Sequence, residues 1–146
     1  VALRDAGVPV AGGFDAPMEK ECLRFLLRGT QPMLILRSPG QRPPRVAPAW
    51  RPAFAAGRLL LAAPFAEAPR RLTRRSAFQR NRVLVALSSV LFVVHAQPES
   101  YTESLVHEAL KWGKPVYTLD LAENAHLLAL GARPLGALGG PLSEAQ

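Results

Sequence analysis

Arginine is the residue type in this sequence with the clearest capacity for chemistry. Arg accounts for fifteen of the eighteen basic residues. Eleven of these lie in residues 37–82 beside a single carboxylate, Glu67, so this stretch carries a net charge of +10, whereas residues 1–36 carry 0 and residues 83–146 carry −3. A field of this kind attracts phosphate groups. Two alternative explanations of the arginine-rich segment stay open. A GC-rich genome would favour Arg codons, and the segment could form a solvated basic surface without a partner.

Much of this charge falls in one predicted helix, residues 70–87. Three- and four-residue spacings place positions 71, 74, 75, 78 and 82 on one helical face. Guanidinium groups bind phosphate through two hydrogen bonds, and Phe78 is placed to stack on a base. Arg80 and Arg82 point about 200° apart on a helix. We therefore expect Arg82 to face a ligand and Arg80 to organise the loop beneath, although a solvated helix face fits the spacing equally well.

Loops that follow predicted strands supply further candidate anion sites. Gly12-Gly13 precedes a helix, where backbone amides can approach a phosphate, but the glycines could equally just form the turn. Ser100-Tyr101-Thr102 begins another helix, where simple capping by Ser100 is the alternative. The candidate phosphate- or nucleic-acid-binding residues are Gly12, Gly13, Phe14, Arg37, Arg71, Arg74, Arg75, Arg80, Asn81, Arg82, Ser100, Tyr101 and Thr102.

Catalytic and metal-binding patterns are missing from the sequence. One cysteine, Cys22, and three scattered histidines give no zinc-ligand spacing. His95 ends a predicted strand, but no Ser or Cys nucleophile accompanies it. Carboxylates such as Asp15 and Asp120 are isolated, so no general acid–base pair can be assigned. We therefore predict no catalytic residue, no metal and no cofactor, and lean against an enzyme.

Elements of two kinds alternate along the chain and must position these residues. Apolar runs predict strands at 8–11, 32–36, 58–63, 90–94 and 115–119, separated by helices at 15–29, 50–56, 70–87, 101–112 and 123–130. This alternation predicts an α/β fold with a doubly wound, mainly parallel sheet of about five strands and helices on both faces. The uniformly apolar run 90–94 predicts a central strand. We also expect Asp15 to cap the first helix, and Leu105 and Trp112 to be buried against the sheet or a second subunit.

The length and hydropathy of the chain limit its number of domains and argue against a membrane span. A chain of 146 residues is one ordinary domain, and its longest weakly polar run, 83–96, is too short to span a bilayer. No signal peptide is visible, so we expect a cytoplasmic protein without membrane attachment. Residues 136–146 are rich in Gly and Pro and are expected to form a flexible tail.

One segment resembles a known family. Arg80-Asn81-Arg82 runs into the apolar stretch 83–94, and this arrangement resembles the Arg-Asn-Arg segment of the DNA-processing protein A (DprA/Smf) family of the SLOG superfamily. The order of the flanking segments also fits: the strand and glycine loop at 6–15, Ser100-Tyr101-Thr102, Gly113-Lys114-Pro115-Val116-Tyr117, and 124–132. The resemblance covers roughly residues 5–135.

The resemblance implies a Rossmann-like domain, here residues 1–135 without the family's first strand and helix. It further implies binding and protection of single-stranded DNA without a catalytic cofactor, contact with a RecA-type recombinase, and often a homodimer. We therefore expect non-enzymatic binding of single-stranded DNA or a similar polyanion. Pro17 and Met18 replace the second glycine of the family's loop, so phosphate binding by that loop is less well supported.

The wider superfamily supplies the alternative, a nucleotide-binding sensor or a nucleoside-monophosphate phosphoribohydrolase. In that case Glu103 is the acid–base residue and Arg82 binds the phosphate. The hydrolases carry Pro-Gly-Gly-x-Gly-Thr-x-x-Glu, whereas this chain has Pro98, Thr102 and Glu103 without the glycine pair. The missing glycines favour binding over hydrolysis.

Overall fold

The computed structural model describes residues 2–39, 46–65 and 73–136 of the chain. The chain divides into two compact units, Val1–Leu84 and Val85–Gln146. Each unit is described by itself below.

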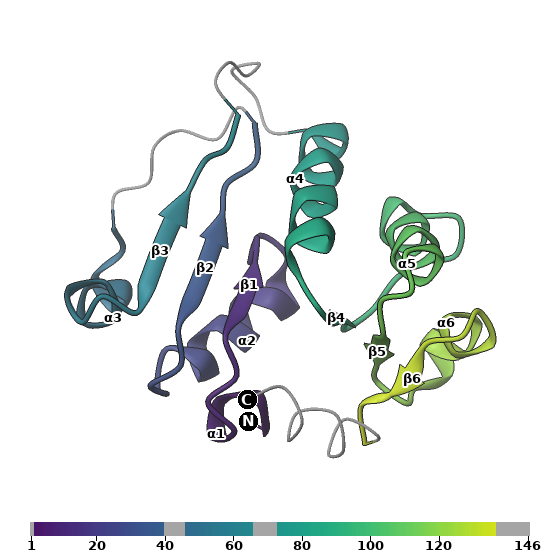
Figure 1. Cartoon of the computed structure of the whole chain (residues 1–146), viewed down its shortest axis with the longest axis horizontal. Helices are drawn as coiled ribbons and strands as arrows, with labels where there is room; N and C mark the ends of the chain where they lie inside the picture. Colours follow the sequence, from purple (N-terminus) through teal and green to yellow (C-terminus); the bar gives the residue numbers. More distant parts are fainter. Residues whose placement is uncertain (1, 40–45, 66–72, 137–146) are drawn as a thin grey trace. The chain divides into compact units, whose positions relative to one another are not determined.

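The first unit contains a three-stranded parallel sheet (Figure 1). β1 (Val10–Gly12) pairs with β2 (Met33–Leu36), and β2 pairs with β3 (Leu59–Ala62). The helices are α1 (Ala2–Asp5), α2 (Pro17–Leu26), the short 3-10 helix η1 (Pro48–Trp50), α3 (Arg51–Ala55) and most of α4 (Arg74–Leu87). Because the strands are parallel, the loops after β1 and β2 leave the sheet at the same edge.

The core of the first unit lies on one face of this sheet. Met33 and Ile35 alternate along β2 and pair in register with Leu59 and Leu61 of β3, so all four share a face. The buried residues Leu23 and Leu26 of α2 and Ala53 of α3 join the same cluster. This burial fixes α2 and α3 against the sheet and thereby sets where the loop after β1 begins and ends.

The second unit holds another three-stranded parallel sheet, in the order β4-β5-β6. Its strands are β4 (Leu91–Val93), β5 (Val116–Thr118) and β6 (Arg133–Pro134). Its helices are α5 (Tyr101–Lys111), η2 (Ala122–Asn124) and α6 (Ala125–Ala129), together with the last residues of α4. Val106, Ala109, Val116, Tyr117 and Leu127 are buried almost completely in this unit.

Comparison with the sequence-based expectations confirms an α/β, Rossmann-like fold of parallel strands alternating with helices. The sheet differs from the expectation, since the strands within the described residues form two three-stranded sheets instead of one sheet of about five. The prediction that 90–94 is central is wrong, because β4 lies at an edge of its sheet. An apolar run reports how well a strand is covered, and it does not specify which strands pair.

Two predictions about single residues also need correction. Asp15 does not cap α2, because the N-cap residue is Ala16, although Pro17 does begin the helix as expected. Leu105 is buried, but Trp112 is 45% exposed in the single chain and so is not buried against the sheet, because it follows the last residue of α5 and its ring lies 5.8 Å from the Lys114 Nζ. Burial of Trp112 against a second subunit stays a prediction. The predicted tail lies outside the described residues apart from Gly136. Within the described ranges, no helix is long and apolar enough to cross a membrane.

Candidate nucleic-acid interface

Hydroxyl groups define the start of α4, the helix that carries most candidate residues. The Thr73 Oγ1 accepts a hydrogen bond from the Ser76 amide at 3.0 Å, and the Ser76 Oγ accepts one from the Thr73 amide at 2.9 Å. This reciprocal arrangement is a capping box built from two hydroxyls. Ser76, Arg80 and Leu84 follow at four-residue spacing and are buried, so they form the inner face of the helix.

Arg80 is the polar centre of that inner face. Its side chain is 3% exposed, and its Nη2 lies 3.0 Å from the Asp15 Oδ2. Its Nη1 donates a 3.0 Å hydrogen bond to the backbone oxygen of Leu36, the last residue of β2. The guanidinium therefore ties α4 to the loop after β1 and to the end of β2. These contacts are the ones expected of an arginine that organises the loop, and burial keeps the Arg80 guanidinium away from solvent.

Gly13 is required by the same contact. A Cβ placed on Gly13 would lie 1.6 Å from the Arg80 Nη1, and the three nearest atoms all belong to the Arg80 guanidinium. Phe14 has a positive φ of 54° and turns its ring over Gly12, against the apolar core of the unit. The loop thus uses its glycines to leave room for the side chains of Phe14 and Arg80, a role that the sequence did not predict.

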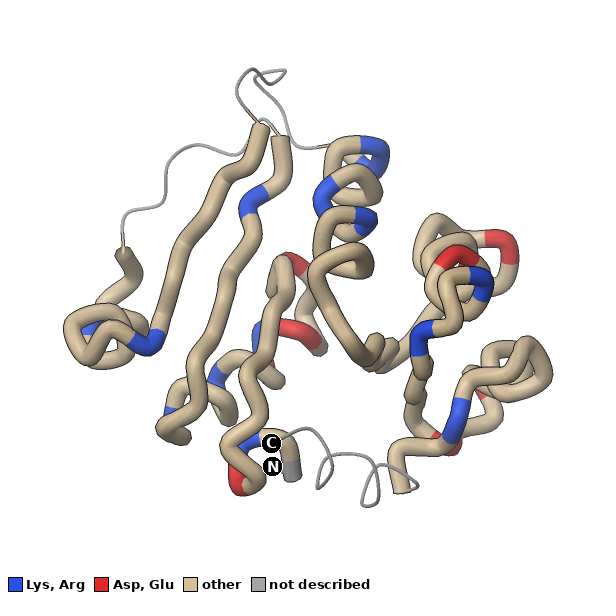
Figure 2. Tube along the Cα trace, viewed as in Figure 1, with Lys and Arg blue, Asp and Glu red and all other residues tan. Residues whose placement is uncertain are grey.

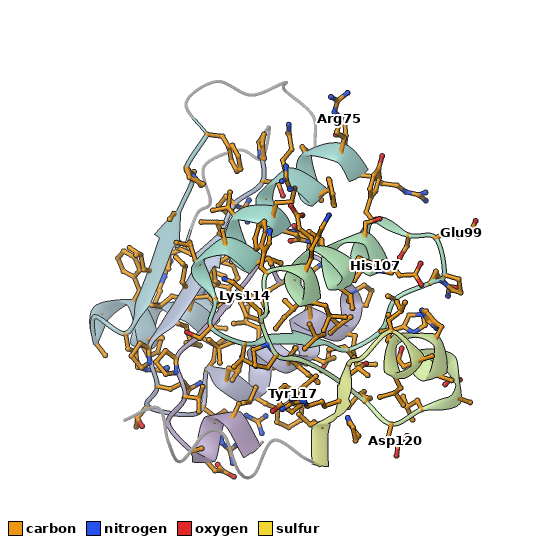
Figure 3. All side chains as sticks on the ribbon, turned by 45° about the vertical axis from the view of Figure 1, so that its right-hand side comes forward. Arg75, Glu99, His107, Lys114, Tyr117 and Asp120 are labelled. Atoms are coloured by element: carbon orange, nitrogen blue, oxygen red, sulfur yellow. The ribbon has the colours of Figure 1, made fainter. Side chains whose placement is uncertain are left out.

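The outer face of α4 carries the exposed cations. Arg74, Arg75 and Arg82 are exposed, and Phe78 is half-buried between them. Arg75 and Arg82 stand seven residues apart, which is about 10.5 Å along the same side of the helix. Figure 2 shows Lys and Arg positions without any Asp or Glu on α4, and Figure 3 shows Arg75 projecting from its N-terminal end. A cation, an aromatic ring and a second cation therefore follow one another along one stripe.

Carboxylates already occupy the N-terminal ends of the other two long helices. The Glu19 Oε2 accepts the Asp15 amide at 3.0 Å and the Ala16 amide at 3.4 Å at the start of α2. At the start of α5 the Glu103 Oε2 accepts the Glu99 amide, while the Ser100 Oγ accepts the Glu103 amide. Free amides and positive dipole ends are what attract a phosphate to a helix. At α2 and α5 the carboxylates of Glu19 and Glu103 already accept these amides and lie at the positive end of the helix dipole.

The N-terminal end of α4 differs from these two in its charge. No acidic residue stands in its first turn, which instead contains Arg74 and Arg75. Cations beside the positive end of a helix dipole are unfavourable by about 0.3–1 kcal/mol each until an anion approaches. Of the three long helices described, α4 is therefore the one whose N-terminal end carries cations and no carboxylate.

The remaining predicted site residues contribute less. Ser100 acts as the helix cap, which is the alternative weighed from the sequence, and Tyr101 and Thr102 lie between Glu99 and Glu103. Arg37 is half-buried at the end of β2, where its amide donates to the Ala62 oxygen. Asn81 is half-buried on α4. Arg71 lies outside the described residues.

His95 and Cys22 are side chains of types that often take part in catalysis, and their surroundings are as follows. The His95 Nδ1 lies 3.2 Å from the Asn124 Oδ1, and its Nε2 lies 3.1 Å from the Gln97 Nε2. Because the Asn124 Nδ2 donates to the oxygens of Val94 and Leu119, its Oδ1 accepts the proton of His95. Burial raises the pKa of the Cys22 thiol, so this cysteine is a poor nucleophile. No cluster of three or more metal-ligating side chains occurs in the described ranges.

Two functional contacts were missed in the sequence. Asp15 and Arg80 are 65 positions apart, and no local pattern links them, so their ion pair required the fold. Glu19 lies in the first turn of α2, where a carboxylate suits the helix dipole, but its bonds to the Asp15 and Ala16 amides were missed, because Ala16 lacks the side-chain acceptor that marks a cap.

Comparison with known proteins addresses the fold. No family model and no curated protein match this chain. One solved structure that does match is DNA processing protein A from Helicobacter pylori, described for its single-stranded DNA binding mode, with a TM-score of 0.59 and 18% sequence identity. The match covers 99% of this chain and 82% of that one. The chain has a DprA-like fold. This agrees with the family resemblance of the Arg-Asn-Arg segment, whose first arginine is the buried Arg80.

Proposed function

We propose that this chain binds single-stranded DNA through the outer face of α4, without carrying out a reaction on it. The observation that carries the proposal is the stripe of Arg75, Phe78 and Arg82, with Arg74 beside it, on a helix that has no acidic residue. The guanidinium groups of arginine form paired hydrogen bonds with phosphate oxygens, and an aromatic ring between two arginines can stack on an unpaired base. The DprA-like fold supports the proposal, because the H. pylori protein is described as binding single-stranded DNA.

The arrangement favours a polymer over a mononucleotide. Arg75 and Arg82 stand about 10.5 Å apart along the helix, a spacing that lets each contact a different phosphate of one strand. The helix ends that would hold a single phosphate carry Glu19 and Glu103. The Glu103 carboxylate, which the hydrolase alternative requires as an acid–base group, accepts a backbone amide instead.

Arg80 has a supporting part in this proposal. It holds the loop after β1 and the end of β2 against α4, so that the outer face of the helix is presented in one orientation. We regard Arg80, Gly13 and Asp15 as positioning residues and the outer arginines as the binding residues. Binding to a RecA-type recombinase and homodimer formation stay predictions of the family resemblance.

A titration of labelled oligothymidine followed by fluorescence anisotropy tests the proposal. Each phosphate contact on a single strand releases counterions, so log K falls with log salt by about 0.7 per contact. Contacts from Arg74, Arg75 and Arg82 predict a slope of about −2 or steeper. AMP, added as competitor, is expected to displace the oligonucleotide only weakly.

The opposite pattern would overturn the proposal. Tight AMP binding with a shallow salt slope would indicate a nucleotide sensor or hydrolase. Release of free base from AMP, followed by chromatography, would establish the hydrolase directly.

A further inference from the structure

Gln79 is a polar residue of α4 that the proposed DNA site leaves without a role. Its side chain is exposed, and within the described part of the chain it forms no hydrogen bond. It stands four residues after Arg75 and three before Arg82, so it neighbours both arginines on the outer face. Phe78 lies on the other flank of the line between them, about 100° away around the helix. One aromatic ring and one amide therefore lie side by side between two arginines.

The chemistry of an amide at this position differs from that of its neighbours. An uncharged group releases no counterions, so Gln79 adds little to phosphate binding where another arginine would add much. The Gln79 side chain instead offers a donor, Nε2, and an acceptor, Oε1, next to each other. Contacts to phosphates hold a strand without reading its sequence, whereas hydrogen bonds to base edges read it. The position of Gln79 therefore suits the edge of a base.

The geometry of a bound nucleotide indicates which edge that is. A base that stacks on the Phe78 ring extends over the surface of the helix towards Gln79. In a purine nucleotide the edge that carries N7 lies nearer to the phosphate than the Watson–Crick edge does. An amide beside phosphate-binding arginines, as Gln79 is beside Arg75 and Arg82, therefore meets the N7 edge.

Adenine is the base whose N7 edge matches an amide. It presents an acceptor, N7, beside a donor, the N6 amino group, and a glutamine side chain pairs with both at once. Guanine presents two acceptors on the same edge and suits arginine instead. Pyrimidines have no N7 and offer no such pair.

We propose that Gln79 recognises an adenine of the bound strand, with its Nε2 donating to N7 and its Oε1 accepting from the N6 amino group, while Phe78 stacks on the face of the base. The inference rests on the proposed function, because Arg75 and Arg82 must hold the strand before the amide can meet a base. Gln79 is then a specificity-determining residue. The arginines bind any single strand, and the amide favours adenine at one position.

Oligomers of deoxyadenosine and of 7-deazadeoxyadenosine test the contact by fluorescence anisotropy. The 7-deaza base carries a carbon in place of N7, so it loses one acceptor and keeps the charge and the stacking face. The wild type is expected to bind the adenine oligomer about fivefold more tightly, which corresponds to one neutral hydrogen bond. Gln79→Met keeps the length of the side chain and should bind both oligomers equally. Gln97→Met, the same change at an exposed position of the second unit, is the control and should keep the fivefold ratio.

Oligothymidine, which lacks N7, separates this inference from the proposed function. Gln79→Met is expected to bind oligothymidine with the affinity and salt slope of the wild type, because every arginine and Phe78 remain. If oligothymidine binds with the expected slope and the wild type does not distinguish adenine from 7-deazaadenine, the role of Gln79 is overturned and the proposed function stands. A preference that persists in Gln79→Met also overturns it, because another residue would then read the base. A wild type that binds none of the oligonucleotides overturns both.

Discussion

At the scale of single residues, two arginines two positions apart have opposite roles. Arg80 is 2% exposed and paired with Asp15, whereas Arg82 is exposed on the outer face of the same helix. The helical rotation of about 200° between them accounts for the division. The sequence could predict this separation, because it follows from helix geometry alone. It could not predict which carboxylate pairs with Arg80.

Replacement of Arg80 tests the positioning role. Arg80→Ala is expected to lower the free energy of unfolding by roughly 3 kcal/mol, the lower end of the range for breaking a buried pair, because Asp15 is 31% exposed and regains water. Urea denaturation of the two proteins measures the difference. A change below about 0.5 kcal/mol, typical of surface substitutions, would contradict the role.

A double-mutant cycle between Gly13 and Arg80 tests the packing of the Arg80 guanidinium against Gly13 more directly. In the wild type, Gly13→Ala should be strongly destabilising, because the new Cβ would overlap the Arg80 guanidinium. In an Arg80→Ala background the same change should be neutral or stabilising by about 0.4–1 kcal/mol, because Gly13 has no positive φ and Ala restricts the unfolded chain. Equal effects in both backgrounds would contradict the proposed packing.

Replacement of Phe78 distinguishes the contribution of base stacking from that of charge at the proposed interface. Phe78→Ala is expected to weaken oligothymidine binding by about 1–3 kcal/mol while leaving the salt slope unchanged. Phe78→Leu is the matched control for packing, because it keeps the half-buried apolar volume and removes the ring. Leucine should preserve stability but not binding; full binding by the leucine variant would exclude stacking.

At the scale of elements, the long helices differ in the groups that satisfy the amides at their N-terminal ends. The N-terminal ends of α2 and α5 are capped by Glu19 and Glu103, whereas that of α4 is capped by hydroxyls and followed by Arg74 and Arg75. The capping box at Ser100 was predictable from its spacing. The one at Ala16 was not, because alanine lacks the side-chain acceptor that marks such sites.

The C-terminal end of α4 is held by Lys114. Its Nζ donates to the oxygens of Val85, Ala86 and Ser88 at 2.6–2.8 Å, so a cation stands at the negative end of the helix dipole. Lys114→Met should lower the free energy of unfolding by about 1–2 kcal/mol. Lys20→Met, an exposed change within α2 and away from a helix C-terminal end, is the control and should cost less than about 0.5 kcal/mol. Thermal unfolding compares the two, and equal effects would contradict the capping role.

At the scale of the whole molecule, alternating apolar and amphipathic segments were enough to predict parallel α/β architecture. They located each of the first five strands to within a few residues, because buried parallel strands are apolar on both faces. The two-residue strand β6 and the helix α1 were missed, since segments so short carry no periodicity. The pairing into two three-stranded sheets was also missed, because hydropathy contains no information on strand order.

The central claim, that the outer face of α4 binds the DNA backbone, is tested most directly by the salt dependence of oligothymidine binding to Arg75→Ala with Arg82→Ala. If each arginine contacts one phosphate, the slope of log K against log salt becomes shallower by about 1.4, and affinity falls at every salt concentration. The control, Arg24→Ala with Arg51→Ala, removes the same charge from other exposed positions of the first unit and should keep the wild-type slope. A wild-type slope in the α4 double variant, or an equal loss in the control, would contradict the account.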